Sequence, residues 1–265
     1  MDLYDAAIAA MGHTAKYSPD QPRHPRGDPR GGQWRDAGGA AGAMATEDQE
    51  GRVVPLDKQA LRDAQRGQSY EQLHANAVEN QRELGMMGRD LERELGVDFI
   101  DPGPKNFKGG FDKIAREGYE GPHELLDLSR GSFVVDTPDQ ANAIIDRLSR
   151  SATVHDNGWK LDREWNYHDR KVYVQFPNGS ASEIQIVHRQ TAGVKGYDGQ
   201  PSVRGVPHGA GHKLYEIART KEPGHPVRER AARLSRRIYG RAIAGSAFAG
   251  MYTMGDISGA PIPGL

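Results

Sequence analysis

The sequence predicts an α/β (α+β) domain in which helices flank a mixed, mostly antiparallel sheet. Two runs of alternating apolar residues, 171–176 and 182–187, surround Pro177-Asn178-Gly179. Asn and Gly accept positive φ, so this pattern predicts a β-hairpin. A second observation is an apolar stripe at helical spacing in 69–95, which predicts a long amphipathic helix. The hairpin and the helix together indicate a sheet with helices packed against it.

The N-terminal segment, residues 1–56, is expected to be a short helix over 2–11 followed by a flexible linker. Four prolines between positions 19 and 29 and a Gly/Ala run at 38–43 leave little apolar surface to offset the entropy of ordering. We therefore expect residues 12–50 to be disordered and dispensable for chemistry. The stretch 18–34 resembles a short Asp-Gln-Pro-Arg…Gly-x-Trp segment of tailed-phage morphogenesis proteins, which hints at phage or prophage origin.

Residues 57–100 are predicted to form a helical lead-in with helices over 57–66 and 69–95. Ser69 is a suitable N-cap with Gln72 at the third helical position, which is a capping-box pattern. Gly96 is suited to end the second helix, because glycine accepts the left-handed conformation of a C-cap.

The next segment, 101–222, carries the predicted sheet, and 223–265 is predicted to be a basic helix and a flexible tail. Thr137-Pro138 is a favourable helix start. A Gly/Pro-rich stretch over 194–210 predicts a mobile loop. The remaining expected elements are helices over 106–117, 138–149, 211–220 and 226–243, and strands over 131–135 and 152–155.

Composition excludes several classes of protein. The chain has no cysteine, which excludes disulfides, Cys-ligated zinc and thiol catalysis. Its formal net charge is −1, so affinity for phosphates must come from local patches. No apolar run reaches the length of a membrane span, and the N-terminus is acidic where an export signal would be basic. We therefore expect a bacterial cytoplasmic protein with no membrane partner.

Three lysines near a predicted helix start form the first candidate site. Lys105 and Lys108 are three residues apart and Lys113 follows two turns later. Like charges at this spacing repel unless an anion lies between them, and a polyphosphate would remove that repulsion. The alternative is a solvated lysine face.

Two carboxylates form the second candidate site. Asp127 stands at the entry to a buried strand, and Glu183 lies in mid-strand with Gln185 on the same face. A carboxylate in such a strand requires a cation or a proton partner, and two on adjacent strands could hold one Mg²⁺. The alternatives are a capping Asp and an exposed Glu.

Tyr167, just before the hairpin, could stack a purine base or simply pack in the core.

The order of these residues resembles the RelA/SpoT-type (p)ppGpp synthetase domain over roughly residues 100–220. The resemblance rests on Lys-x₇-Lys, Asp-Leu before Val-Val, Tyr-x-x-x-Lys-Val-x-Val, Asn-Gly followed by Glu-Ile-Gln-Ile, and Gly-His-Lys-Leu-Tyr-Glu. It is similar above all to the small, single-domain members, including phage- and toxin-borne ones. This resemblance implies a nucleotidyltransferase-like fold and transfer of pyrophosphate from ATP to a ribose 3′-hydroxyl, with Mg²⁺.

The resemblance also implies a role for each candidate. Asp127 and Glu183 would bind Mg²⁺ and act in catalysis, Glu183 by activating the acceptor hydroxyl. Tyr167 would stack the acceptor base, with Gln185 and His212 beside it. The residues expected to bind ATP phosphates are Lys105, Lys108, Lys113 and Arg130.

Three positions depart from the family pattern. Gly103 stands where an arginine is usual, Val187-His188 where Arg-Thr is frequent, and Asn166 where glycine is common. Lys108 and Arg130 could supply the missing positive charge. The His-Asp hydrolase domain of the long family members is not visible in the sequence, so no hydrolase activity is expected.

The acceptor stays open between GDP or GTP, an adenine nucleotide, and the 3′ end of a tRNA. The stretch 213–241 holds nine Lys and Arg against three Glu, a patch that could bind an RNA backbone or simply be solvated. A neutralising antitoxin or a phage structural protein is a further candidate partner. Two other functions remain open: a non-catalytic virion or morphogenesis protein on this fold, and a nucleotide-binding module that senses alarmones.

Overall fold

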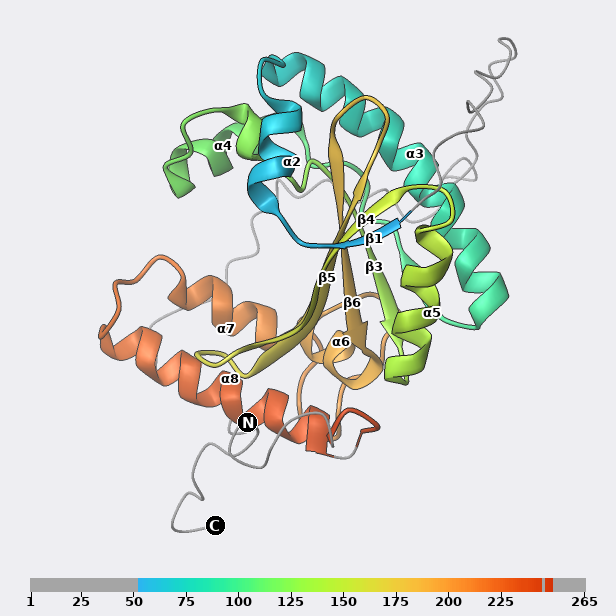
Figure 1. The fold of residues 1–265 in the computed structure, drawn as a ribbon. Coiled ribbons are helices and arrows are strands. Elements are labelled where there is room, and N and C mark those ends of the chain that lie inside the picture. The colour runs from blue at the N-terminus through green and yellow to red at the C-terminus, as the bar shows by residue number, and fades with distance from the viewer. Residues whose placement is uncertain (1–51, 245, 250–265) are drawn as a thin grey trace, which may run out of the picture. The chain divides into compact units, whose positions relative to one another are not determined.

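The computed structural model describes residues 52–244 and 246–249, which lie within the compact unit Gln49–Leu265. A six-stranded sheet in the order β1-β4-β5-β6-β3-β2 forms its centre (Figure 1). Three of the five strand pairs are antiparallel and two, β1 with β4 and β3 with β6, are parallel. The predicted mixed, mostly antiparallel sheet is therefore confirmed. The strands are β1 Arg52–Pro55, β2 Asp98–Ile100, β3 Ser129–Val135, β4 Thr153–Asp162, β5 Tyr167–Gln175 and β6 Ala181–His188.

Seven α-helices and one 3-10 turn are found among the described residues. They are α2 Lys58–Gln65, α3 Tyr70–Leu95, α4 Phe107–Glu117, η1 Pro122–Glu124, α5 Pro138–Leu148, α6 Arg189–Lys195, α7 Ala210–Ala218 and α8 Pro226–Ala244. The capping box at Ser69 is present, and Gly96 ends α3 in the left-handed conformation. Thr137 caps α5 with a second capping box, which confirms the predicted helix start.

The core lies between one face of the sheet and the helices α3 and α5 (Figure 1). Ile184 and Ile186 of β6 are fully buried there, together with Phe133 of β3. Leu84 of α3 and Ile144 of α5 pack against them. Because side chains alternate between the two faces of a strand, burying this set turns Glu183 and Gln185 to the opposite face.

The opposite face carries a polar row across three strands. Glu183 pairs with Tyr173 of β5 on one side and with Arg130 of β3 on the other, and Gln185 pairs with Lys171. Two groups of helices flank this face, α2 with α4 toward one end of the strands and α7 with α8 toward the other (Figure 1). The candidate residues therefore meet between the two groups.

Four short elements were not predicted from the sequence: β1, β2, η1 and α6. β1 falls within the stretch that the sequence assigns to a linker, yet Arg52–Pro55 pairs in parallel with the start of β4. β2 has three residues and α6 seven, too few for periodicity to reveal them. The stretch expected to be a mobile loop begins inside α6. Within it, His208 bonds the carbonyl of Tyr197, and Gln200 donates to Asp98.

Several predictions concern residues outside the described part of the chain. They are the helix over 2–11, the disordered linker over 12–50 and most of the C-terminal tail. Among the helices that the structure does describe, none combines the length and the apolar character that a membrane span requires.

His188, the last residue of β6, provides a test of stability against pH. It is buried, and burial lowers the pKa of its imidazole from 6.5 to about 4. Between these values the unfolded chain binds a proton that the folded protein does not bind. The free energy of unfolding therefore falls as pH drops from 6.5 to 4, by up to about 3 kcal/mol from this residue.

His188→Asn is expected to make this pH dependence shallower. Asparagine keeps a side-chain acceptor for the Gln190 N–H, which His188 caps, but does not titrate. Urea denaturation of both proteins at pH 4.5 and pH 7 measures the effect. An equal loss of stability in the two proteins would contradict this assignment.

Candidate active site

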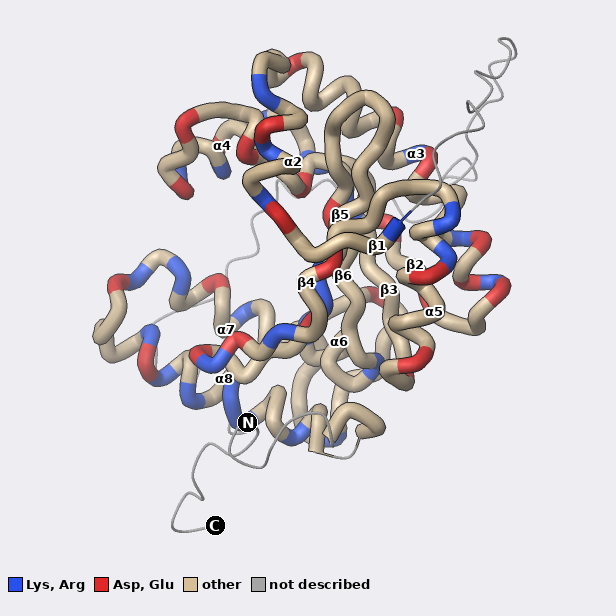
Figure 2. Tube along the Cα trace, in the orientation of Figure 1, with Lys and Arg blue, Asp and Glu red and all other residues tan. Residues whose placement is uncertain are grey.

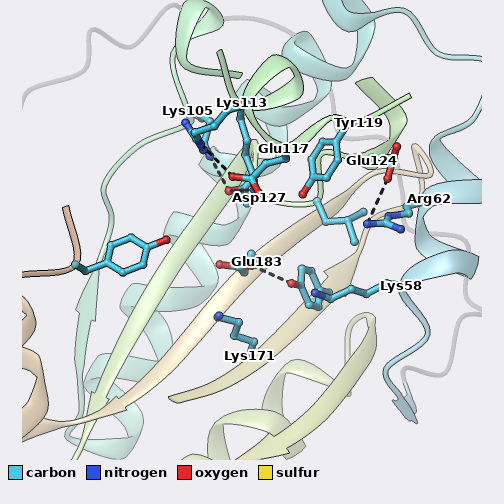
Figure 3. Close-up of a pocket in the computed structure, with 14 residues that line it drawn as sticks. Lys58, Arg62, Lys105, Lys113, Glu117, Tyr119, Glu124, Asp127, Lys171 and Glu183 are labelled. Carbon is cyan, nitrogen blue, oxygen red and sulfur yellow. Dashed lines mark hydrogen bonds and ion pairs between the residues drawn. The ribbon is translucent and has the colours of Figure 1, made fainter. Parts of the chain in front are cut away.

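A cavity of about 360 Å³ opens on the polar face of the sheet, between β5, β6 and the helices α2 and α4 (Figure 3). Asp127 and Glu183 both line it, as do Lys105 and Lys113. The structure thus brings the two predicted carboxylates and two of the predicted lysines into one cavity. The remaining lining residues are Lys58, Arg62, Arg116, Glu117, Tyr119, Glu124, Leu126, Lys171, Tyr173 and Tyr215.

Asp127 is the most strongly paired carboxylate of this cavity. Its Oδ2 accepts hydrogen bonds from Lys105 Nζ at 2.6 Å and Lys113 Nζ at 2.8 Å. Burial alone would raise the pKa of Asp127, but the two ammonium groups outweigh it and lower the pKa. The other oxygen, Oδ1, is buried and has no hydrogen-bond partner among the described residues. Asp127 is therefore ionised and keeps one oxygen available.

Glu183 lies in the middle of β6, held on both sides by uncharged donors. The Tyr173 hydroxyl donates to Oε2 at 2.9 Å, and the Gln185 amide donates to Oε1 at 3.1 Å. Burial and the nearby Glu183 charge raise the pKa of Tyr173, so its phenol stays protonated and can donate. These contacts orient the carboxylate but leave lone pairs free on both oxygens.

Positive charge also reaches the cavity from residues to which the sequence analysis gave no role in the site. Lys58 and Arg62 come from α2, Arg116 from α4 and Lys171 from β5. Burial lowers the pKa of Lys58. The described lining holds six cationic side chains against four carboxylates, so the cavity favours an anionic ligand. Alternation in β5 could have revealed Lys171, since it shares a face with Tyr173.

Two predicted phosphate ligands, Lys108 and Arg130, are not among the residues that line this cavity. Lys108 has a side chain that is 84% exposed, and it pairs with Asp112 on the outer face of α4. Arg130 lies on β3, in register with Glu183, but does not line the cavity. Its backbone is held by Gln81 of α3. The structure thus separates Lys108 from the other candidates, whereas Arg130 shares the polar face with Glu183. Burial lowers the pKa of Lys105, and the nearby charge of Arg130 adds to this effect.

A second cavity, of about 300 Å³, adjoins the first and shares Lys171 and Tyr215 with it. The three predicted acceptor residues, Tyr167, Gln185 and His212, all line this second cavity. Its other lining residues are Asp162, Trp165, Lys195, Gly211, Ser235 and Tyr239. Two cavities of different character therefore meet along β5 and β6, one rich in cations and one rich in aromatic rings.

Tyr167 is held at the wall of the second cavity. The Lys195 ammonium donates to its hydroxyl at 2.8 Å, and the Tyr239 ring packs edgewise against its own ring. The residue before it, Asn166, has φ of 55°, a left-handed conformation that glycine and asparagine tolerate best. Asn166 therefore adopts a backbone conformation that a glycine could also adopt at this position.

The residues present fit a magnesium ion shared with a phosphate ligand. Asp127 offers a buried oxygen without a partner, and Glu183 lies in the same cavity. Among the described residues no cluster of three or more His, Asp or Glu side chains could form a complete protein cage. Mg²⁺ typically takes one or two carboxylates plus substrate phosphates and water, which suits this donor set.

Comparison with solved structures identifies the fold. The chain is similar to the Type VI effector Tas1, solved in complex with its immunity protein: 23% identity, a TM-score of 0.54, and 66% of this chain covered against 97% of the other. The chain has a RelA/SpoT-type synthetase fold.

Two further similar structures are small alarmone synthetases from Bacillus subtilis. Small alarmone synthetase 2 is 11% identical, with a TM-score of 0.39 over 63% of this chain and 92% of that one. Small alarmone synthetase 1, solved with its product pppGpp, is 14% identical, with a TM-score of 0.38 over 64% and 90%. No family model and no curated protein sequence matches the chain. The RelA/SpoT-type fold that the motifs imply is confirmed by the Tas1 comparison.

Asp127→Asn is expected to destabilise the fold, because it leaves two partly buried ammonium groups close together without a counter-charge. All three side chains are at most 20% exposed, so we expect a loss of about 2 to 4 kcal/mol in the free energy of unfolding. Asp112→Asn is the matched control, since it removes only the exposed partner of Lys108 and should cost less than about 0.5 kcal/mol. Chemical denaturation measures both. Equal losses would mean that the Asp127 pairs add no more than a surface contact.

Proposed function

We propose that this protein transfers pyrophosphate from ATP to the 3′-hydroxyl of a nucleotide. The observation that carries the proposal is the junction of the two cavities. A cationic cavity suited to a triphosphate meets an aromatic cavity suited to a base and ribose, and Glu183 lies on the strand that runs between them. The RelA/SpoT-type synthetase fold supports the same chemistry.

The donor would bind in the cationic cavity. Lys105 and Lys113 are held in place by Asp127 before any ligand arrives, so binding ATP would require little reorganisation of these side chains. Lys171 stands where the two cavities meet. Burial lowers its pKa, but Asp169 and Glu183 outweigh this effect and raise it, which keeps the ammonium charged. It is therefore suited to neutralise charge on the transferred phosphates.

The acceptor would bind in the aromatic cavity, with its base on Tyr167 and its ribose toward Glu183. The acceptor 3′ oxygen forms a bond to the β-phosphorus while the bond from that phosphorus to the oxygen bridging the α-phosphate breaks. AMP leaves with the electron pair of the broken bond, and the hydroxyl proton passes to Glu183. The protein contributes positioning and charge neutralisation, which suffice for much of the acceleration in phosphoryl transfer.

Asp127 and Glu183 are the residues that would hold Mg²⁺. When bound, this ion would neutralise charge on the triphosphate oxygens. The available Oδ1 of Asp127 supports this assignment.

A free nucleotide is the acceptor that the geometry favours over a tRNA. The residues of α8 that line the aromatic cavity, Ser235 and Tyr239, are buried on one side of the helix. Arg233 and Arg237 are exposed, about 200° away around the helix. Figure 2 shows acidic and basic residues interspersed along α7 and α8. An RNA backbone bound to these arginines would therefore lie on the far side of α8 from the acceptor cavity.

The likeness to Tas1 extends the proposal to regulation. That effector was solved with its immunity protein. By analogy, we propose that this protein acts as a toxin and is neutralised by a protein partner.

The reaction is tested by mixing the protein with labelled ATP, Mg²⁺ and, in turn, GDP, GTP, ADP, AMP or tRNA. We expect AMP and a 3′-pyrophosphorylated free nucleotide, and no product when EDTA removes the metal. Pyrophosphorylated tRNA without any modified free nucleotide would overturn the choice of acceptor. Absence of AMP with every acceptor would overturn the proposed reaction.

Glu183→Gln is expected to lower kcat by at least about 100-fold, the lower range for loss of a general base. The fold should stay intact, because the amide still accepts from Tyr173. Glu124→Gln is the matched control. Glu124 lines the same cavity but pairs with Arg62, and this change should alter kcat less than about fivefold. Steady-state kinetics measures kcat for both variants, and circular dichroism checks that each is folded. Turnover at the wild-type rate in Glu183→Gln would contradict its role.

Lys113→Met and Lys108→Met separate the two sides of α4. Lys113 faces the cavity and Lys108 faces solvent. We expect the first change to weaken ATP binding about tenfold or more, the loss of roughly 1.4 kcal/mol or more of binding energy. The second should leave affinity unchanged. Isothermal titration with ATP and Mg²⁺ measures both, and equal affinities would contradict the placement of ATP.

A further inference from the structure

Lys195 belongs to none of the motifs that carry the family resemblance, yet it joins the two sides of the proposed acceptor site. It is in the last turn of α6 and lines the aromatic cavity. Its ammonium donates to the Tyr167 hydroxyl at 2.8 Å and also to the Oε1 atom of Gln185. A single side chain therefore contacts both the aromatic ring and the polar strand face of the site.

The local fold explains how Lys195 reaches this place. After β6 the chain turns at His188, whose side chain accepts from the Gln190 N–H and begins α6. Gly196 then ends α6 with φ of 102°, a left-handed conformation that a side chain would strain. A Cβ at this position would also lie 2.9 Å from the Cα of Gly209. This short helix returns the chain over the polar face of the sheet.

The ammonium does not cover the Tyr167 ring. It is 2.8 Å from the hydroxyl oxygen but 5.0 Å from the ring centroid, so it lies at the hydroxyl end. Burial raises the pKa of Tyr167, which keeps the phenol protonated. The oxygen thus accepts from Lys195 while the ring faces are not occupied by the ammonium.

The same lysine determines which way the Gln185 amide points. An ammonium group can only donate, so the amide oxygen must face Lys195. The Tyr197 hydroxyl also donates to this oxygen, at 3.1 Å. The amide nitrogen is then left to face Glu183, where it donates to Oε1 at 3.1 Å. A continuous hydrogen-bonded chain therefore runs from Tyr167 through Lys195 and Gln185 to Glu183.

We propose that Lys195 is a positioning residue that holds the acceptor-binding ring and the Glu183 carboxylate in fixed relation, so that a nucleotide stacked on Tyr167 presents its 3′-hydroxyl to Glu183. This inference rests on the proposed function. Lys195 does not line the donor cavity. Its loss is therefore expected to affect the acceptor and the proton transfer, and to spare ATP.

The test compares Lys195→Met with Lys213→Met. Lys213 is an exposed lysine of α7 that lines neither cavity, so it controls for the loss of one charge. We expect Lys195→Met to raise the acceptor KM and lower kcat, each about tenfold, while the Kd for ATP by isothermal titration stays within twofold. Lys195→Arg keeps a donor and should recover part of both effects.

Tyr167→Phe provides a second variant that keeps the ring and removes only the hydroxyl. Because Lys195 acts on the acceptor KM through that hydroxyl, Lys195→Met should raise KM much less in the Tyr167→Phe background than alone. The effect of Lys195→Met on kcat, which it exerts through the Gln185 amide, should persist in the Tyr167→Phe background. Fully multiplicative effects of the two changes on KM would overturn the proposed coupling, and so would kinetics of Lys195→Met equal to those of Lys213→Met.

Direct binding separates this inference from the proposed reaction. Titration of wild type and Lys195→Met with GDP and with ADP requires no turnover. Weaker binding to the variant supports the positioning role even if no pyrophosphate is transferred, whereas absent transfer by wild type overturns the reaction alone. Equal binding to both proteins, or no binding to wild type, overturns the role of Lys195.

Discussion

The carboxylate of Asp127, shared between Lys105 and Lys113, is the contact on which the cationic cavity depends. Three charged side chains, each at most 20% exposed, converge there. Such a group is stable only while its charges are balanced. The contact ties α4 and the segment before it to the start of β3, which builds one wall of the cavity. The pairing that stabilises these lysines therefore also holds them at the cavity, where the proposed function requires positive charge.

The alternation of side chains along the strands determines which residues of the sheet line the site. Ile184 and Ile186 are buried against α3 and α5, and this fixes Glu183 and Gln185 on the polar face. The register between β6 and β5 then places Tyr173 beside Glu183 and Lys171 beside Gln185. A shift of one residue would send Glu183 into the core. The burial of apolar residues on one face thus determines which polar side chains lie on the other face.

The sequence predicted the place of Glu183 and Asp127, although it missed Lys171 on the regular strand β5 and misplaced Lys108 on the regular helix α4. The alternating hairpin predicted Glu183, and the strand that follows Asp127 predicted its place at a strand entry. Helical periodicity could also have separated Lys108 from Lys113, because five residues correspond to about 140° around a helix. Lys58 and Lys195 were not predictable in this way. Each comes from a short helix whose position depends on tertiary packing, and no spacing in the sequence records that packing.

The two cavities share a charged boundary, where the proposed donor and acceptor would meet. Lys171 lies on this boundary and forms an ion pair with Asp169 at 3.5 Å. Burial raises the pKa of Asp169, although the Lys171 charge opposes this effect. A triphosphate drawn toward Lys171 would bring its phosphorus atoms next to the strand that carries Glu183. In the proposed reaction, the cation that attracts ATP would therefore also lie near the carboxylate that accepts the proton, because β5 and β6 place Lys171 and Glu183 on one face as diagonal neighbours.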